Sequence, residues 1–217
     1  MLVGLVSSHL MNKPMIFLGS ASPRRAELLA QIGVAFQVLV ADIDETPKPG
    51  ESAEIYVLRM ALEKAKAVLA QSEPSVLPVL AADTSVVVDG DILGKPRDQA
   101  EAMAMLARLS GRTHQVLTAV ALVGSGVEAA RASRLSVNKV RFRVISEAER
   151  LAYWQTTEPQ DKAGAYAIQG HAAVFIEHLE GSFSGVMGLP LFETAALLAE
   201  FGINVCDSWG DWARADN

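Results

Sequence analysis

Two adjacent arginines, Arg24 and Arg25, follow Ser20, Ser22 and Pro23 at the start of a predicted helix. Ser22 as N-cap and Pro23 at the first helical position are typical of a helix start. Cations are disfavoured there, because the N-terminal end of the helix dipole is already positive. Backbone N–H groups at a helix N-terminus bind phosphate, so two guanidinium groups and two hydroxyls beside them would complete an anion site. The alternative is that both arginines are simply solvated.

Two acidic positions could supply a base and a metal ligand. Asp83-Thr84 follows the apolar run 79–82, so we expect a carboxylate at the end of a buried strand, where α/β sheets tend to place ligands. Glu45, in the acidic loop 42–51, offers the hard oxygen ligands that Mg²⁺ takes alongside substrate phosphates. The alternatives are a turn aspartate that closes a strand and an ordinary solvated loop carboxylate.

Two lysines could reach a phosphate group. Lys95 stands in Gly94-Lys95-Pro96, and Lys64 lies on a long predicted helix; either could equally be a surface lysine. Other familiar sites are absent from the sequence. It contains no G-x-G-x-x-G after a strand and no G-x-x-x-x-G-K-[ST], which excludes dinucleotide-binding and P-loop motifs, and no G-x-S-x-G or H-E-x-x-H. The four histidines show no ligand spacing, so we expect them to be structural or exposed.

Strand and helix signals alternate along the chain, and these elements must position the candidate residues. The alternation predicts an α/β fold with a mixed twisted sheet flanked by helices. Turns at Asp89-Gly90 and at 124–126 predict hairpins, so the sheet is not purely parallel. Ser146 with Glu149 forms a predicted capping box. Predicted strands cover 15–18, 34–40, 76–82, 85–89, 113–123, 128–144, 165–168 and 173–178, and predicted helices cover 23–32, 52–69, 98–109, 146–157 and 190–201.

The composition sets the class of protein. The chain has 217 residues, of which 50% are hydrophobic and 20% charged, a composition typical of globular proteins. Its 19 basic and 25 acidic residues argue against a protein whose main role is to coat nucleic acid or acidic membranes. A single cysteine, Cys206, excludes an intramolecular disulfide and fits a cytoplasmic protein. No basic residue precedes the apolar start 1–6, so we expect no signal peptide, and no apolar run reaches the ~20 residues of a membrane span.

The expected organisation is one domain with two short additions. No repeat, low-complexity run or interdomain linker divides the chain, so residues 15–203 are expected to form a single α/β domain. Residues 1–14 are expected to be a loose N-terminal extension. Residues 204–217 form a C-terminal tail, for which packing of the terminus is the simplest expectation.

An ordered set of motifs carries a family resemblance. The motifs are 20–29 (SASPRRAELL), 82–84 (ADT), 94–96 (GKP), 109–114 (LSGRTH), 161–170 (DKAGAYAIQG) and 188–190 (GLP). In this order they resemble the Maf family of nucleoside triphosphate pyrophosphatases over about residues 15–201. The stretch 161–170 resembles the subfamily that acts on dTTP and UTP, in contrast to the branch that acts on 7-methyl-GTP.

The resemblance implies a reaction and a role for individual positions. Asp83 matches the family's proton acceptor, which would activate water for attack on the α-phosphorus and release pyrophosphate and a monophosphate. The other matching positions are Arg24, Thr84 and Gln169 for substrate choice, Arg25, Lys64 and Lys95 near the triphosphate, and Glu45 near the metal. The Gln169 amide can both donate and accept at a pyrimidine edge.

The resemblance also implies partners and leaves alternatives open. The family needs a divalent cation, Mg²⁺ or Mn²⁺, has an inosine triphosphatase-like architecture, and is often a homodimer; sanitising the nucleotide pool is its usual explanation. The sequence departs from the family's pattern at 171–173 and 182–187. These departures leave open the finer nucleotide preference, including whether modified pyrimidine triphosphates are hydrolysed. The family has also been linked with inhibition of septum formation, so a nucleotide-sensing binding module is one alternative, and a 7-methyl-GTP enzyme is another.

Overall fold

The structure, a computed structural model, describes residues 13–72, 77–124 and 131–209. Its centre is a seven-stranded mixed sheet in the order β2-β1-β3-β5-β6-β7, with β4 paired to β3 beside that path. The strands β1 and β2 are parallel to each other, as are β1 and β3, and the other pairs are antiparallel. The strands are β1 (Ile16–Leu18), β2 (Phe36–Val38), β3 (Val79–Val88), β4 (Asp91–Leu93), β5 (Thr113–Val123), β6 (Arg131–Phe142) and β7 (Ile176–Glu180).

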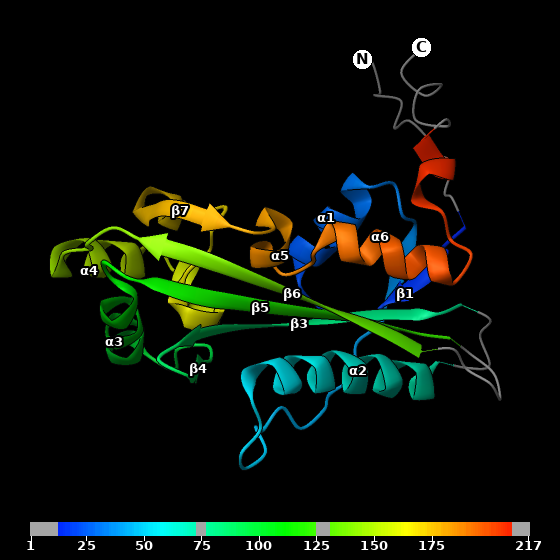
Figure 1. The fold of residues 1–217 in the computed structure, drawn as a ribbon, viewed down its shortest axis with the longest axis horizontal. Helices are drawn as coiled ribbons and strands as arrows, with labels where there is room; N and C mark the ends of the chain where they lie inside the picture. Colours follow the sequence, from blue (N-terminus) through cyan, green and yellow to red (C-terminus); the bar gives the residue numbers. More distant parts are fainter. Residues whose placement is uncertain (1–12, 73–76, 125–130, 210–217) are drawn as a thin grey trace, which may run out of the picture.

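Helices cover both faces of this sheet (Figure 1). The long helix α2 runs along one face, whereas α1, α5 and α6 lie on the other, and α3 and α4 sit together at one end of the long strands. The mixed α/β architecture predicted from the sequence is therefore confirmed. The α-helices are α1 (Pro23–Gln31), α2 (Ala53–Gln71), α3 (Gln99–Leu109), α4 (Glu147–Gln155), α5 (Phe183–Met187) and α6 (Leu191–Glu200), and the 3-10 helices are η1 (Glu158–Asp161), η2 (Ala163–Ala165), η3 (His171–Phe175) and η4 (Val205–Ser208).

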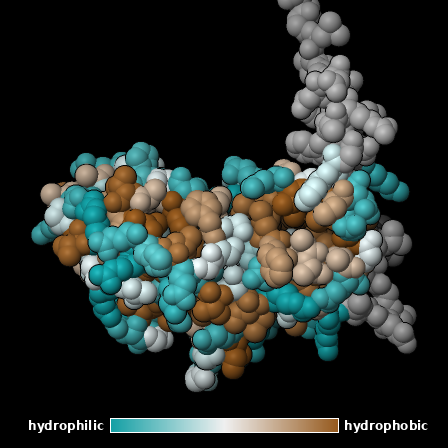
Figure 2. Space-filling model, turned by 45° about the horizontal axis from the view of Figure 1, so that its top comes forward, coloured by the Kyte–Doolittle hydropathy of each residue, from teal (hydrophilic) through white to brown (hydrophobic). Residues whose placement is uncertain are grey.

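The core lies on both faces of the central strands. Every residue of β3 is buried except Thr84, which is half-buried, and most of β5 is buried as well. Strands covered on both faces require near-continuous apolar sequence, which the valines, leucines and alanines of these two strands supply. On the face that Figure 2 shows, hydrophobic side chains at the surface form several patches separated by hydrophilic ones.

Local sequence signals fix several element boundaries. The Ser52 hydroxyl accepts a hydrogen bond from the Ile55 N–H at the start of α2. Ser146 and Glu149 form the predicted capping box at the start of α4. Asp89 and Gly90 have φ of 54° and 84°, the left-handed conformation that a two-residue hairpin between β3 and β4 requires.

One prediction about the central strand is wrong. The sequence suggested two strands interrupted at Asp83-Thr84, but β3 runs without a break from Val79 to Val88. The reason is that β5 pairs with it throughout, with Asp83 opposite Ala119 and Thr84 opposite Thr118. This ladder satisfies the backbone groups that a turn would have left open.

Other boundaries differ from expectation in smaller ways. Of residues 165–168, predicted as a strand, Ala165 is the last residue of η2 and 166–168 lie outside any strand; the strand predicted over 173–178 begins only at Ile176. The strand β2 is limited to Phe36–Val38, and the five-residue helix α5 had no separate sequence signal.

The ends of the chain fall partly outside the described residues. The expected extension 1–14 is described only at 13–14, and the predicted hairpin turn at 124–126 only at its first residue. Of the tail 204–217, residues 204–209 are described: Val205 is buried in the core and the Trp209 indole donates to the Ile32 carbonyl at 3.2 Å. Within the described residues, no helix combines the length and the hydrophobicity needed to cross a membrane.

Candidate active site

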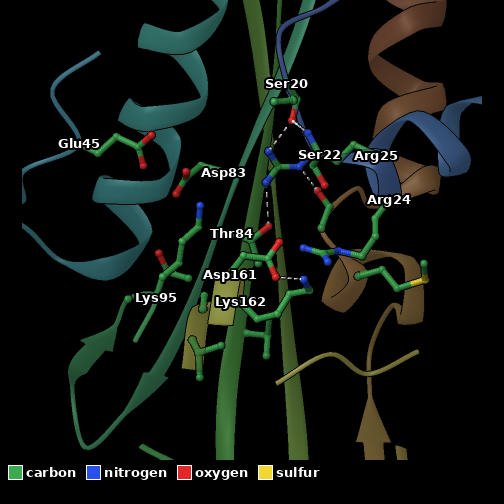
Figure 3. Close-up of a pocket in the computed structure, with 18 of the residues that line it drawn as sticks. Ser20, Ser22, Arg24, Arg25, Glu45, Asp83, Thr84, Lys95, Asp161 and Lys162 are labelled. Carbon is green, nitrogen blue, oxygen red and sulfur yellow. Dashed lines mark hydrogen bonds and ion pairs between the residues drawn. The ribbon is translucent and has the colours of Figure 1, made fainter. Parts of the chain in front are cut away.

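A pocket of about 790 Å³ opens beside the centre of β3 (Figure 3). Along this edge of β3, pairing with β1 ends at Leu80 and pairing with β4 begins at Val86, so the stretch between them has no strand neighbour on that side among the described residues. The pocket fills this gap, and Asp83 and Thr84 lie in it although they are in mid-strand. Every site residue predicted from the sequence lines it: Arg24, Arg25, Glu45, Lys64, Asp83, Thr84, Lys95 and Gln169.

The carboxylate of Asp83 is buried and paired with a lysine. Its side chain is 9% exposed, and Oδ1 lies 2.7 Å from the Lys64 ammonium. The same ammonium lies 3.1 Å from Glu45 Oε1, and the Glu45 side chain is 56% exposed. One cation on α2 therefore lies between two carboxylates that come from β3 and from the loop 42–51. Sequence reasoning had assigned Lys64 only to the triphosphate.

The loop that carries Glu45 is anchored to α2 by two side chains. The Tyr56 hydroxyl donates to the Glu45 backbone carbonyl at 2.9 Å. Arg59 donates to the Thr46 carbonyl at 3.1 Å and makes a two-pronged ion pair with Glu51 at 2.6 Å. Burial raises the pKa of Tyr56 to about 12, so its phenol stays protonated and remains a donor.

Tyr56 was missed by sequence reasoning, although it lines the pocket itself. No pattern within its own helix could have identified Tyr56 as a site residue. Within its helix Tyr56 occupies an ordinary core-facing position, and only its contact with Glu45 reveals a role in the site.

Arg25 joins three segments around the pocket. Its guanidinium donates to the Gly188 carbonyl at 2.8 Å, to the Ser20 hydroxyl at 3.1 Å and to the Thr84 hydroxyl at 3.3 Å. Burial lowers the pKa of Arg25 below its ordinary value, and the charge of Asp83 opposes that effect, so the group stays a cation at neutral pH. Its remaining N–H donors can serve an anion.

A chain of hydroxyls continues from Thr84 into the core. The Thr84 and Thr118 hydroxyls are 3.0 Å apart, and Thr118 donates to the Gly185 carbonyl at 2.8 Å. Because Gly185 belongs to α5, this chain links the two central strands to the segment whose Gly188 carbonyl receives Arg25. The pocket wall is thus held by buried hydrogen bonds.

Arg24 and Lys95 are the cations that keep their donors available. Neither makes a side-chain hydrogen bond or an ion pair within the described part of the chain. In Figure 3 the Lys95 side chain extends toward Asp83. Asp161 lies near Arg24 and contacts Lys162; burial acts to raise the pKa of Asp161, but this contact and both positive charges outweigh it and lower that pKa.

The predicted anion site at the start of α1 has the expected components. Ser22 is the N-cap residue but its hydroxyl makes no capping bond, and Pro23 occupies the first turn. The backbone N–H of Ser22 donates to the Ser20 hydroxyl at 3.2 Å. The first-turn N–H groups are therefore not used by the N-cap side chain, which suits phosphate binding.

Gln169 lines the pocket from a tight turn. The Gly170 N–H donates to the Ala167 carbonyl at 3.1 Å and closes this turn. The Gln169 side chain is exposed and lines the pocket, and among the described residues it has no hydrogen-bond partner. Both its donor and its acceptor are available to a ligand.

A buried histidine supports the pocket wall. Tyr166 lines the pocket, and its hydroxyl lies 2.8 Å from His114 Nε2. His114 is 2% exposed, and burial lowers its pKa to about 4, so the ring is neutral at neutral pH. This agrees with the expectation that the histidines are structural.

The residues present fit a divalent cation that is held jointly with a phosphorylated ligand. Within the described residues, no group of three or more His, Cys, Asp or Glu side chains could hold a metal alone. Glu45 and Asp83, however, offer carboxylate oxygens that both reach the Lys64 ammonium. Mg²⁺ is commonly bound by one or two carboxylates, waters and substrate phosphates, and this donor set matches that pattern.

Comparisons with known proteins place the sequence among described relatives. Residues 15–201 match the family model described as Maf-like protein. A protein of Alkalilimnicola ehrlichii named dTTP/UTP pyrophosphatase is 54% identical over 201 residues, which cover 91% of this chain and 98% of that protein. One of Aromatoleum aromaticum with the same name is 54% identical over 200 residues, covering 86% and 95%. The solved structure of a HAM1 protein from Coxiella burnetii aligns with a TM-score of 0.47 at 17% identity, covering 87% of this chain and 100% of that chain.

Proposed function

The chain belongs to the Maf family, and from this premise we propose that it is a nucleoside triphosphate pyrophosphatase that hydrolyses dTTP and UTP to the monophosphate and pyrophosphate. The observation that carries the proposal is one pocket in which a buried carboxylate, Asp83, lies with Arg24 and Lys95, two cations that make no side-chain hydrogen bond or ion pair with the described residues. Phosphoryl chemistry needs mainly positioning and charge neutralisation, and these residue types supply both.

The reaction assigns one proton transfer to Asp83. Water attacks the α-phosphorus, its oxygen forms the new P–O bond, and its proton passes to the Asp83 carboxylate. The bond between the α-phosphorus and the bridging oxygen breaks, and pyrophosphate leaves. A carboxylate suits this role because it is already ionised at neutral pH. Asp83 is buried and lines the pocket, so a ligand in the pocket would be next to its carboxylate.

The cations have separate tasks in this mechanism. Arg24 and Lys95, whose side chains are not committed elsewhere in the described structure, neutralise the triphosphate. Arg25 holds the walls together and offers its remaining donors, and Lys64 holds Asp83 and Glu45 in place. Glu45 with Asp83 would hold Mg²⁺ or Mn²⁺, which when bound would neutralise phosphate charge and activate the phosphorus toward attack.

The substrate preference is assigned to Gln169, Thr84 and Arg24, which all line the pocket. The Gln169 amide, which has no hydrogen-bond partner among the described residues, can donate and accept at the edge of a pyrimidine base, as the hydrogen-bonding pattern of uracil and thymine requires. Figure 3 shows the Arg24 side chain near Asp161, which precedes Gln169 in the same segment of the chain. Hydrolysis of modified pyrimidine triphosphates would follow if the pocket tolerates added groups on the base.

The proposal also covers the domain organisation, the cellular location and the oligomeric state of the protein. Residues 15–203 would form one domain acting in the cytoplasm to sanitise the nucleotide pool, as a homodimer of the kind common in the family. Light scattering of the full chain measures the oligomeric state directly.

A substrate panel tests the proposed function. Pyrophosphate release is measured with Mg²⁺ or Mn²⁺ across dTTP, UTP, CTP, GTP, ATP and 7-methyl-GTP. Turnover concentrated on dTTP and UTP is expected. Stoichiometric binding without pyrophosphate release would instead favour a nucleotide sensor acting on cell division, and turnover confined to 7-methyl-GTP would favour the other branch of the family.

A further inference from the structure

The turn that carries Gln169 is tied down at its first residue by a buried tyrosine. The Ala167 N–H donates to the Tyr153 hydroxyl at 3.1 Å. Tyr153 lies on α4 and is 3% exposed, and its ring packs edge-on against Phe175 at a centroid distance of 5.5 Å. A buried ring of this kind has one available orientation, so its hydroxyl is a fixed anchor.

The other end of the turn is tied to a carboxylate. The His171 N–H donates to Glu158 Oε2 at 3.0 Å, and the His171 ring nitrogen Nδ1 lies 3.0 Å from the same oxygen. The Tyr153 hydroxyl donates to the second oxygen, Oε1, at 2.6 Å. A single tyrosine–carboxylate pair thus holds both ends of the Ala167–Gly170 turn.

This clamp, formed by Tyr153 and Glu158, leaves no space for a side chain at Gly170. A Cβ atom at Gly170 would lie 2.1 Å from Glu158 Oε2, so only glycine fits while the carboxylate keeps its position. Burial acts to raise the pKa of Glu158, but the hydrogen bonds from Tyr153 and His171 outweigh it and lower that pKa. Glu158 is therefore an ionised acceptor at neutral pH and satisfies the donors that converge on it.

We propose that Tyr153 and Glu158 are positioning residues that set the discrimination among nucleotide bases by holding the Gln169 turn in one place. The inference rests on the proposed function, in which the Gln169 amide contacts the base. Neither Tyr153 nor Glu158 lines the pocket, so they act through the turn and not on the ligand. Discrimination by a hydrogen-bonding amide requires placement within about 0.5 Å, which an exposed side chain on an untethered turn would not achieve.

The test compares discrimination in variants that keep the packing. Tyr153→Phe removes only the hydroxyl, and Glu158→Gln keeps the size of the side chain that faces Gly170 but removes one acceptor. We expect kcat/KM for UTP relative to CTP to fall about tenfold in each, since a misplacement of about 1 Å costs up to ~100-fold. Glu149→Gln is the matched control, because Glu149 also lies on α4, accepts from the Ser146 N–H at 2.8 Å and pairs with Arg143 at 2.7 Å, without contacting the turn.

Coupling to Gln169 separates positioning from a general structural effect. In a Gln169→Ala background, Tyr153→Phe and Glu158→Gln should change the UTP to CTP ratio less than twofold, because the group that they position is gone. Amide hydrogen exchange of the full chain should show protected N–H groups at Ala167 and His171, with protection at Ala167 lost in Tyr153→Phe. Should Glu158→Gln fail to fold, Tyr153→Phe carries the test by itself.

Several results would overturn the inference. These are an unchanged UTP to CTP ratio in folded Tyr153→Phe, an equal change in Glu149→Gln, or an undiminished effect in the Gln169→Ala background. The failure of the proposed function has a different signature, since the native protein would then release no pyrophosphate from any nucleotide in the panel.

Discussion

The ammonium group of Lys64 lies 2.7 Å from the carboxylate of Asp83. This contact joins the middle of α2 to the centre of β3, and both side chains are largely buried, at 16% and 9% exposure. Removing one partner of a buried ion pair leaves an uncompensated charge, which costs more than the pair contributes as a whole. The two residues are therefore expected to respond differently to substitution.

Asp83→Asn is expected to abolish turnover while the protein stays folded. The amide has nearly the same shape but cannot take a proton from water, and loss of a general base costs about 10²- to 10⁴-fold in rate. The measurement is pyrophosphate release from dTTP and UTP, with nucleotide binding followed by calorimetry. Asp91→Asn is the control, because Asp91 is the exposed first residue of β4 and its side chain is 67% exposed. Near-native turnover of Asp83→Asn would remove Asp83 from the mechanism.

Lys64→Met is expected to lower stability more than Asp83→Asn does. The methionine leaves the buried Asp83 carboxylate without its cation, whereas in Asp83→Asn the lysine keeps its contact with Glu45. A loss of about 3 kcal/mol in the free energy of unfolding is expected for Lys64→Met. Urea unfolding measures it, and the double variant Lys64→Met/Asp83→Asn should recover part of the loss. Strictly additive effects would contradict the coupling.

Removal of divalent metal is expected to stop turnover, and Glu45→Gln to raise the metal requirement. EDTA should reduce pyrophosphate release to background, and added Mg²⁺ should restore it. Because an amide is a weaker ligand than a carboxylate, half-maximal activity of Glu45→Gln should need about tenfold more Mg²⁺. The titration is done at saturating nucleotide. Overlapping Mg²⁺ curves for the native protein and Glu45→Gln would separate Glu45 from the metal.

Gln169→Ala is expected to blunt discrimination among nucleotides. Hydrogen bonds to a base edge distinguish ligands because a mismatched donor or acceptor is left unpaired, at a cost of about 1–3 kcal/mol, or roughly 10- to 100-fold. The quantity to measure is kcat/KM for UTP relative to CTP. Turnover of UTP should fall while that of CTP changes little. Unchanged relative values would show that another residue reads the base.

The protein is expected to become less stable as the pH falls, because His114 is buried in the folded state. Burial lowers the pKa of His114 in the folded protein to about 4. The ordinary value of about 6.5 applies to the unfolded chain, so the unfolded state binds more protons between these two values, and stability is lost as pH falls from about 6.5 to 4. The difference of about 2.5 pKa units corresponds to a loss on the order of 3 kcal/mol.

The measurement is urea unfolding of the native protein and of His114→Gln at pH 7.5 and 4.5. Glutamine can still hydrogen-bond the Tyr166 hydroxyl but does not titrate. The variant should therefore show a smaller loss of stability between the two pH values. Parallel losses in the two proteins would assign the pH dependence to other groups.

Local signals in the sequence were reliable wherever neighbouring residues decide the structure. The Ser146–Glu149 capping box and the Asp89-Gly90 turn formed as predicted, because a cap or a two-residue turn is determined by a few adjacent residues. The same reasoning failed at Asp83-Thr84. There the turn preference of the two residues was overridden by the ladder that β5 supplies from more than thirty residues further along the chain.

The sequence by itself determined the α/β class, the Ser146–Glu149 capping box and eight candidate site residues that all line the pocket, because motif order and hydrophobic periodicity are properties of the chain. Only the tertiary structure decided that Asp83 lies in the gap between β1 and β4, that Lys64 lies between Asp83 and Glu45, and that Tyr153 and Glu158 hold the Gln169 turn. These relationships join side chains from separate elements. Their geometry depends on how the sheet pairs and how the helices pack against it, which no local pattern in the sequence encodes.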